Sequence, residues 1–130
     1  MTHRLPFLAG CLLLLTAAPL LADEAEDKAV EAVEKLGGMV TRDEKAEGKP
    51  VVAVDFRGSL VLTDADLKEL APLKELRTLY LGGTEVTDAC LKELAALKGL
   101  QELYLFGCRE VTAAGVAELR KALPDCKITR

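Results

Sequence analysis

The sequence is poor in the side chains that most enzymes use for catalysis. Its single histidine is His3, its single serine is Ser59, and it contains neither asparagine nor tryptophan. Nucleophilic catalysis requires a nucleophile beside a base, and phosphate binding commonly uses a glycine-rich loop of fixed spacing; the chain has neither pattern. Two carboxylates can hydrolyse a glycosidic bond, but the candidates Asp55 and Glu102 lie two sequence repeats apart. We therefore expect the protein not to be an enzyme.

Cysteine is also scarce, and its spacing argues against a metal site. Apart from Cys11, near the start of the chain, the cysteines are Cys90, Cys108 and Cys126. Their number is odd and they include no Cys-x-x-Cys pair, so neither a full disulfide framework nor a zinc site is indicated. We expect no metal and no cofactor, and thiols that pack as small apolar groups. A disulfide between Cys108 and Cys126 in an oxidising compartment is the alternative.

Positive charge is in deficit. The chain carries 17 basic and 21 acidic residues, for a formal net charge of −4. Removal of residues 1–22 would take away Arg4 and no acidic residue, so the net charge would become about −5. Nucleic acids and anionic lipid surfaces attract basic proteins. The sequence therefore argues against both as partners.

The one long apolar run begins the chain. Residues 5–22 are almost entirely apolar, they follow a short basic start, and acidic residues begin at Asp23. This order is typical of a secretory signal peptide that is cleaved after Ala22, so we expect a secreted or periplasmic protein of bacterial type. Two alternatives remain: residues 5–22 stay as a membrane anchor, or Cys11 is lipidated, as in the bacterial lipobox.

A repeat of leucines dominates the rest of the sequence. The motif Leu-x-x-Leu-x-Leu at residues 76–81 recurs 24 residues later, at residues 100–105. The block between them, which starts at Val86, has a similar copy before it at Leu62 and a degraded copy after it at Val111. Two intact and two partial units are therefore present, and this period is typical of leucine-rich repeats.

The leucine spacing predicts one strand and one helix in each unit. Leu79 and Leu81 are two residues apart, so in a strand they point to the same side. Leu67, Leu70 and Leu73 are three apart, so in a helix they form one stripe. One strand and one helix cannot enclose a core alone, whereas stacked units can.

Threonine marks the expected start of each helix. The residues at these N-cap positions are Thr63, Thr87 and Thr112. Asp66 follows Thr63 at the spacing of a capping box. Asp64 and Asp88 would place negative charge at the positive end of their own helices.

These units resemble bacterial leucine-rich-repeat proteins of the ribonuclease-inhibitor-like class. They are also similar to the cysteine-containing repeats of eukaryotic F-box proteins, in which Thr-Asp-x-x-Leu opens the helix. The resemblance covers residues 51–130 and implies an α/β fold: a short leucine-rich-repeat solenoid with parallel strands on the concave face, helices on the convex face, and an N-terminal helical cap. The repeat motif encodes packing, so the resemblance implies no active site.

The segment before the repeats is expected to cover their first unit. Residues 23–36 read as an amphipathic helix, Gly37-Gly38 as its end, residues 39–41 as a short strand and residues 43–50 as a loop. The helical positions expected on one apolar face are Ala25, Ala29, Val33 and Leu36. We interpret this segment as a cap; a separate helical recognition element is the alternative.

The expected division of the chain is therefore a signal peptide (1–22), an N-terminal cap (23–50) and a leucine-rich-repeat domain (51–130). The repeat domain is expected to open with a strand over residues 51–56. At its other end, Cys126 and Ile128 match the two inward positions of a last strand, with Cys126 at the position of Leu103.

Aromatic positions give the only indication of a binding site. Tyr80 and Tyr104 stand between paired leucines and therefore point outward; Phe106 also points outward, whereas Phe56 takes an inward position. Neighbouring strands lie about 4.8 Å apart, so the tyrosines should lie side by side. The charged residues expected around them are Asp55, Arg57, Arg77 and Glu102. Tyrosine is enriched at binding hot spots, but aromatic residues also suit strands in general, and both interpretations stay open.

The combined expectation is an interaction module that binds a protein partner of unknown identity through its concave strand face. The first alternative is a structural envelope component that self-assembles through its exposed terminal strands. The second is carbohydrate or cell-wall binding through the tyrosine row.

Overall fold

Residues 24–130 are described by the structure, which is a computed structural model. The predicted signal peptide, the alternative anchor and Cys11 lie outside the described residues. Within residues 24–130, no helix is long and apolar enough to cross a bilayer.

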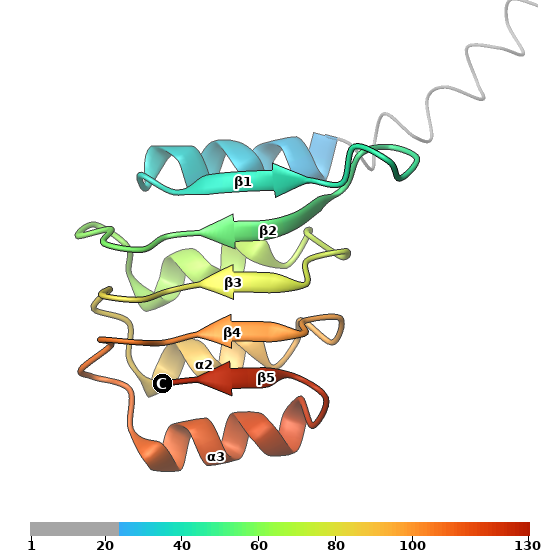
Figure 1. The fold of residues 1–130 in the computed structure, drawn as a ribbon. Coiled ribbons are helices and arrows are strands. Elements are labelled where there is room, and N and C mark those ends of the chain that lie inside the picture. Colours follow the sequence, from blue (N-terminus) through green and yellow to red (C-terminus); the bar gives the residue numbers. More distant parts are fainter. Residues whose placement is uncertain (1–23) are drawn as a thin grey trace, which may run out of the picture.

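The fold is a mixed α/β arrangement around one open, five-stranded sheet in the order β1-β2-β3-β4-β5 (Figure 1). The strands are β1 (Met39–Arg42), β2 (Val51–Asp55), β3 (Thr78–Tyr80), β4 (Glu102–Tyr104) and β5 (Lys127–Thr129). The helices are an N-terminal helix whose described part spans residues 24–35, the 3-10 helix η1 (Asp64–Leu70), α2 (Asp88–Leu94) and α3 (Ala113–Ala122). The N-terminal helix lies beside β1 and α3 lies beside β5, so helices flank both ends of the sheet.

The strands pair in the register that the leucine period predicts. β2 to β5 are parallel, and Leu79 lies between Val54 and Leu103. Leu103 in turn lies opposite Ile128, so the expectation that Cys126 takes the position of Leu103 is wrong by two residues. Thr112 precedes Ile128 by 16 residues, as Thr87 precedes Leu103, so the last strand keeps the spacing of the preceding unit when it is counted from the N-cap threonine. Both Cys126 and Ile128 are nevertheless buried, as expected for inward positions.

β1 departs from this parallel order. It pairs antiparallel with β2, with Met39 opposite Asp55. The predicted short strand is thus confirmed, one residue longer than expected. A short loop joins β1 to β2, and antiparallel strands are the ones that short loops can join.

The N-terminal helix packs on the core through part of its predicted apolar face. Ala29 and Val33 are buried, and Leu36 is half-buried against the core. The prediction was wrong for Ala25, which is exposed. Glu26, the next residue, is turned toward the sheet because it is paired there with an arginine.

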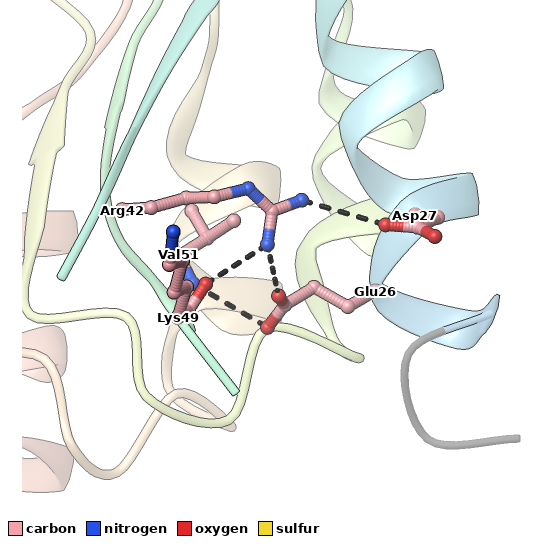
Figure 2. Close-up of polar contacts among 5 residues, drawn as sticks. All are labelled: Glu26, Asp27, Arg42, Lys49 and Val51. Atoms are coloured by element: carbon pink, nitrogen blue, oxygen red, sulfur yellow. Dashed lines mark hydrogen bonds and ion pairs between the residues drawn. The ribbon is translucent and has the colours of Figure 1, made fainter. Parts of the chain in front are cut away.

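This pairing joins the N-terminal helix to the β1–β2 hairpin (Figure 2). Arg42 donates from Nη1 to Glu26 Oε1 at 2.8 Å and to the Lys49 carbonyl at 2.9 Å, and from Nη2 to Asp27 at 3.4 Å. The other Glu26 oxygen accepts from the backbone N–H of Val51 at 3.4 Å. Arg42 therefore connects β1 to the helix and the loop, and Glu26 connects the helix to the start of β2.

The predicted core is confirmed. The side chains of Leu79, Leu81, Leu94 and Leu103 are at most 1 % exposed, and Phe56 is equally buried at the inward position expected for it. The leucine stripe of the first helix is buried as well: Leu67, Leu70 and Leu73. Both sets of inward residues belong to one hydrophobic cluster, as the stacking of units requires.

The first helix differs from its expected form. Helical residues follow Thr63 and Thr87 as predicted, but η1 is a 3-10 helix whereas α2 is an α-helix. One difference between the two units is Pro72, which has no N–H to donate. The equivalent Ala96 donates to the carbonyl of Glu93 in the turn that ends α2. The turn after η1 lacks that bond.

The second and third N-cap threonines each donate hydrogen bonds to an aspartate of the preceding unit. Asp64 accepts from the backbone N–H and hydroxyl of Thr87 at 2.7 and 2.6 Å. Asp88 accepts in the same way from Thr112, at 2.8 and 2.5 Å. Both aspartates occupy the first turn of their own helices, as predicted. The bonds between units were not predicted, and they connect successive helix starts along the stack.

A second set of contacts satisfies carbonyl groups in the loops after the strands. Ser59 donates to the Leu36 carbonyl at 2.7 Å, and both Thr84 and Cys108 donate to the Leu81 carbonyl, at 2.7 and 2.9 Å. Each of these side chains therefore helps to satisfy a backbone carbonyl.

The three described cysteines are free and buried, which agrees with the predicted packing role. Burial, together with the nearby charge of Asp64, raises the pKa of Cys90 to about 12. Burial also raises the pKa of Cys126. Both thiols are therefore protonated at neutral pH.

Candidate binding surface on the sheet

Among residues 24–130, no helix covers the face of the sheet that is nearer the viewer in Figure 1. Residues opposite one another on neighbouring strands share a face, so the register places one side chain from each strand in a row across it. This row consists of Met39, Asp55, Tyr80, Tyr104 and Thr129.

The two tyrosines stack in the middle of the row. Their ring centroids are 4.8 Å apart and their planes differ by 10°, which confirms the predicted side-by-side arrangement. On the β2 side, the guanidinium group of Arg57 lies 5.0 Å from the centroid of Tyr80. Both faces of the Tyr80 ring are therefore covered, and the ring edge is what remains for solvent or a partner.

Asp55 neutralises Arg57. The arginine donates from Nε to both carboxylate oxygens at 3.0 Å and from Nη2 to Oδ2 at 2.6 Å, and its backbone N–H adds a bond of 2.9 Å. The side-chain bonds from Arg57 are the main reason that the pKa of Asp55 lies below its ordinary value. A carboxylate held in this way stays ionised and is poorly suited to act as a general acid.

The second carboxylate near the row is also paired. Tyr104 donates its hydroxyl proton to Glu102 at 2.6 Å. This bond raises the pKa of Tyr104 and fixes the direction of its ring. The polar atoms around the stacked tyrosines thus bond mainly to one another.

A groove of about 620 Å³ opens beside the tyrosines, at the carboxyl ends of β3 and β4. Its lining is aromatic and glycine-rich: Arg57, Tyr80, Gly82, Gly83, Tyr104, Phe106 and Gly107. We call it the aromatic groove. Its only charged lining residue, Arg57, is the one that Asp55 neutralises.

Gly82 forms the floor of the aromatic groove. The backbone pairing continues here beyond the strands: Gly58 donates to the Gly82 carbonyl at 3.0 Å, and Gly83 donates to the Phe106 carbonyl at 2.9 Å. Gly82 therefore stands between Arg57 and Phe106 in three neighbouring units. Because it has no side chain, a space is left between Arg57 and Phe106: a Cβ atom here would lie 3.8 Å from Cγ of Arg57 and 3.0 Å from the Phe106 carbonyl oxygen.

Phe106 is the most exposed aromatic residue described, at 76 % of its surface, as its outward position predicted. Three other large apolar side chains are exposed and were missed: Met39, Leu60 and Val61. Met39 could be placed on the open face only from the antiparallel register of β1. Leu60 and Val61 occupy the loop after β2, at positions where the third unit has Arg109 and Glu110.

The structure does not bring all the predicted surface residues together. Arg77 is exposed but precedes β3, at the opposite end of that strand from the aromatic groove, and does not line it. Glu102 borders the tyrosines through its bond to Tyr104, and Asp55 does so through Arg57.

A second groove of about 630 Å³ adjoins the first along the loops and has a different character. It shares Gly83 and Gly107 with the aromatic groove, but its other lining residues are polar: Thr84, Glu85, Arg109 and Glu110. Within residues 24–130, no group of three or more His, Cys, Asp or Glu side chains is arranged to hold a metal ion.

Comparison with models of known protein families gives no match for this chain, and comparison with curated proteins gives none either. Function must therefore be inferred from the residues themselves. Among these, the aromatic groove and the open sheet face combine exposed apolar side chains with internally paired charges.

Proposed function

We propose that the protein is a short leucine-rich-repeat solenoid that binds a protein partner through the open face of its sheet. The observation that carries this proposal is the exposed phenyl ring of Phe106 beside an open groove and a stacked tyrosine pair. Exposed aromatic side chains gathered at one site are typical of binding hot spots. The strand face would be the concave side and the helices the convex side.

The regular contacts between units support the solenoid. Leucines pair in register across β3 and β4, and equivalent aspartate–threonine bonds recur one unit later. In repeat proteins each unit contacts mainly its neighbours, and the resulting strand surface is commonly used for binding. Residues 23–50 would then serve as the N-terminal cap, after export of the chain and cleavage of residues 1–22.

The geometry of the tyrosines favours a protein over a carbohydrate. A sugar ring packs its C–H groups against an open aromatic face. Arg57 and Tyr104 cover the two faces of Tyr80, so this ring cannot serve as such a platform. Ring edges and the phenyl group of Phe106 suit apolar side chains of a protein better.

The free edge of β5 is poorly suited to pair with a strand of a second copy of the protein. This strand has three residues, and the Ile128 carbonyl already accepts a hydrogen bond from Arg120 at 3.4 Å. Short, partly blocked edges pair poorly with another chain. Hydrolysis of a glycosidic bond with Asp55 as the general acid is disfavoured, because Arg57 holds this carboxylate ionised.

The test is affinity capture from the native envelope, followed by measurement of affinity for the partner that is found. Tyr80→Ala/Tyr104→Ala should lose about tenfold or more in affinity, which corresponds to about 1.4 kcal/mol. Lys92→Ala, on the exposed side of α2, is the matched control and should bind like the wild type. Equal affinity of the double variant and the wild type would move the site away from the sheet face. Retention on cell-wall polysaccharide that depends on the tyrosines would establish the carbohydrate alternative instead.

A further inference from the structure

We propose that the aromatic groove receives one large, uncharged apolar side chain of the partner, held between Arg57 and Phe106 above Gly82. This inference rests on the proposed function, because it specifies what a protein partner inserts at the same surface. It follows from the space, the charges and the glycines of the groove.

The space between the two walls fits one flat or branched side chain. Arg57 and Phe106 belong to units on either side of Gly82, so their backbones are two strand spacings apart, about 9.6 Å. A group in van der Waals contact with both walls needs about 7–8 Å between the wall atoms. At the floor the gap is narrower, because a Cβ atom on Gly82 would lie 3.8 Å from Cγ of Arg57 and 3.0 Å from the Phe106 carbonyl oxygen, so an inserted side chain would rest above this level.

The charges around the aromatic groove favour an uncharged occupant. Two nitrogens of the Arg57 guanidinium group donate hydrogen bonds to Asp55, and Glu102 accepts a hydrogen bond from the Tyr104 hydroxyl. An acidic side chain would compete with Asp55 for Arg57, and a basic one would find a cation at one wall and a phenyl group at the other. Desolvating either charge would cost free energy that an apolar side chain does not lose.

Gly82 differs from its glycine neighbours in a way that supports this role. Gly58, Gly83 and Gly107 have φ angles of +74° to +78°, a conformation that favours glycine. Gly82 has no positive φ, and the equivalent positions hold Arg57 and Phe106. An alanine there would place its methyl group 3.0 Å from the Phe106 carbonyl oxygen and would occupy the floor of the groove. Glycine at this position therefore keeps the groove open.

The test is selection of short random peptides displayed on phage against the full-length protein. Enriched peptides should share one large apolar residue, and its replacement by alanine or lysine should weaken binding about tenfold or more. Phe106→Ala, which removes one wall, and Gly82→Ala, which fills the floor, should each have a similar effect. Lys92→Ala should have none. If Gly82→Ala lowers the melting temperature, Phe106→Ala alone decides the result, because its side chain is exposed.

The outcomes separate this inference from the proposed function. Peptides that depend on Phe106 but require a charged residue would overturn the inference and leave protein binding at this face in place. Peptides whose binding requires the tyrosines but is unchanged in Gly82→Ala and Phe106→Ala would also overturn the inference and leave protein binding at this face in place. A selection that yields no peptide dependent on the tyrosines or Phe106 would overturn both.

Discussion

The N-terminal segment and the repeats are stabilised by different interactions. Of the apolar side chains in residues 24–50, only Ala29 and Val33 are fully buried, and the helix is joined to the hairpin mainly through Arg42. In the repeats, every unit contributes several buried leucines to one cluster. Buried apolar area supplies most of the free energy of folding, so we expect the N-terminal segment to open at a lower free energy than the repeats.

The helix starts show the same contrast on a smaller scale. Thr87 and Thr112 each depend on an aspartate from the preceding unit. The backbone N–H of Thr63 instead donates to the carboxylate of Asp66 in its own unit, at 2.8 Å. No acidic residue of the N-terminal segment takes the role that Asp64 has toward Thr87. The repeats are therefore coupled to one another through these bonds, whereas residues 24–50 are not coupled in this way to the first repeat.

The largest effect should come from removing a leucine in the centre of the repeats. Leu103→Ala should destabilise the protein by about 2–5 kcal/mol, because it leaves a cavity between Leu79 and Ile128, which lie on either side of Leu103. A domain of this size is stable by about 5–15 kcal/mol in total, so thermal unfolding monitored by circular dichroism should shift strongly. Val33→Ala in the N-terminal helix removes less volume and should cost less. An equal or larger loss for Val33→Ala would remove the contrast between the two regions.

A smaller and more local effect should follow from Glu26→Gln. This change removes the charge that pairs with Arg42, in a contact where the glutamate side chain is only 15 % exposed. We expect a loss of about 1 kcal/mol, since the pair is partly solvated. Amide hydrogen exchange should accelerate in residues 24–35 and remain unchanged in β3 and β4. Glu31→Gln, on the exposed side of the same helix, is the control. Acceleration throughout the sheet would show that the N-terminal segment and the repeats unfold as one unit.

The sequence predicted the repeats better than the N-terminal segment, for a physical reason. Burial in a repeat recurs with a fixed period, so Leu79, Leu103 and the stacked tyrosines could be placed without knowing any tertiary contact. The pairing of Glu26 with Arg42 joins residues that no period relates, and Ala25 was misplaced for the same reason. Met39 was missed because its face depends on the antiparallel register of a hairpin.

Two features of the fold recur with the sequence period although the period alone did not predict them. Alignment of the units places Gly82 between Arg57 and Phe106, which already indicates a gap between two large side chains. The bonds from Asp64 and Asp88 to the next threonine recur at 23 and 24 residues, yet the sequence assigned these aspartates only to their own helices. Contacts between units require the stacking geometry as well as the period.

The coupling between units predicts a dependence on acid. Hydrogen bonds from Thr112 hold the pKa of Asp88 below its ordinary value of 3.8. A lowered pKa in the folded state means that the stabilisation is complete above the ordinary pKa and is lost as the pH falls through the folded pKa. The melting temperature should therefore fall below about pH 4, and Asp88→Asn should make this fall shallower. The loss of stability on protonation of Asp88 should be smaller than the loss caused by Glu26→Gln at neutral pH, because the Asp88 carboxylate is more accessible to solvent. A fall of the same steepness in Asp88→Asn would show that other groups control it.

Gly115→Ala tests the same contact without changing a charge. Alanine favours a helix over glycine by about 1 kcal/mol, so this substitution in the first turn of α3 would ordinarily stabilise the protein. Here its methyl group would overlap Oδ1 of Asp88 and displace the carboxylate from Thr112. We expect the melting temperature to stay level or fall. A clear rise would mean that the bond between these units contributes little.

The smallest effect on stability should come from Phe106→Ala. Its ring is 76 % exposed and packs against neither the leucine core nor the Arg42 network, so the change should stay within about 0.5 kcal/mol. Leu105→Ala, one residue earlier and fully buried, is the matched control and should cost about 2–5 kcal/mol. Thermal unfolding of the two variants side by side measures the difference. If Phe106→Ala destabilises the protein by more than about 1 kcal/mol, the aromatic residues stabilise the fold in addition to the Arg42 contacts of the N-terminal segment and the leucine contacts of the repeats. A neutral result leaves Phe106 without a structural role, which is the condition that its use in binding requires.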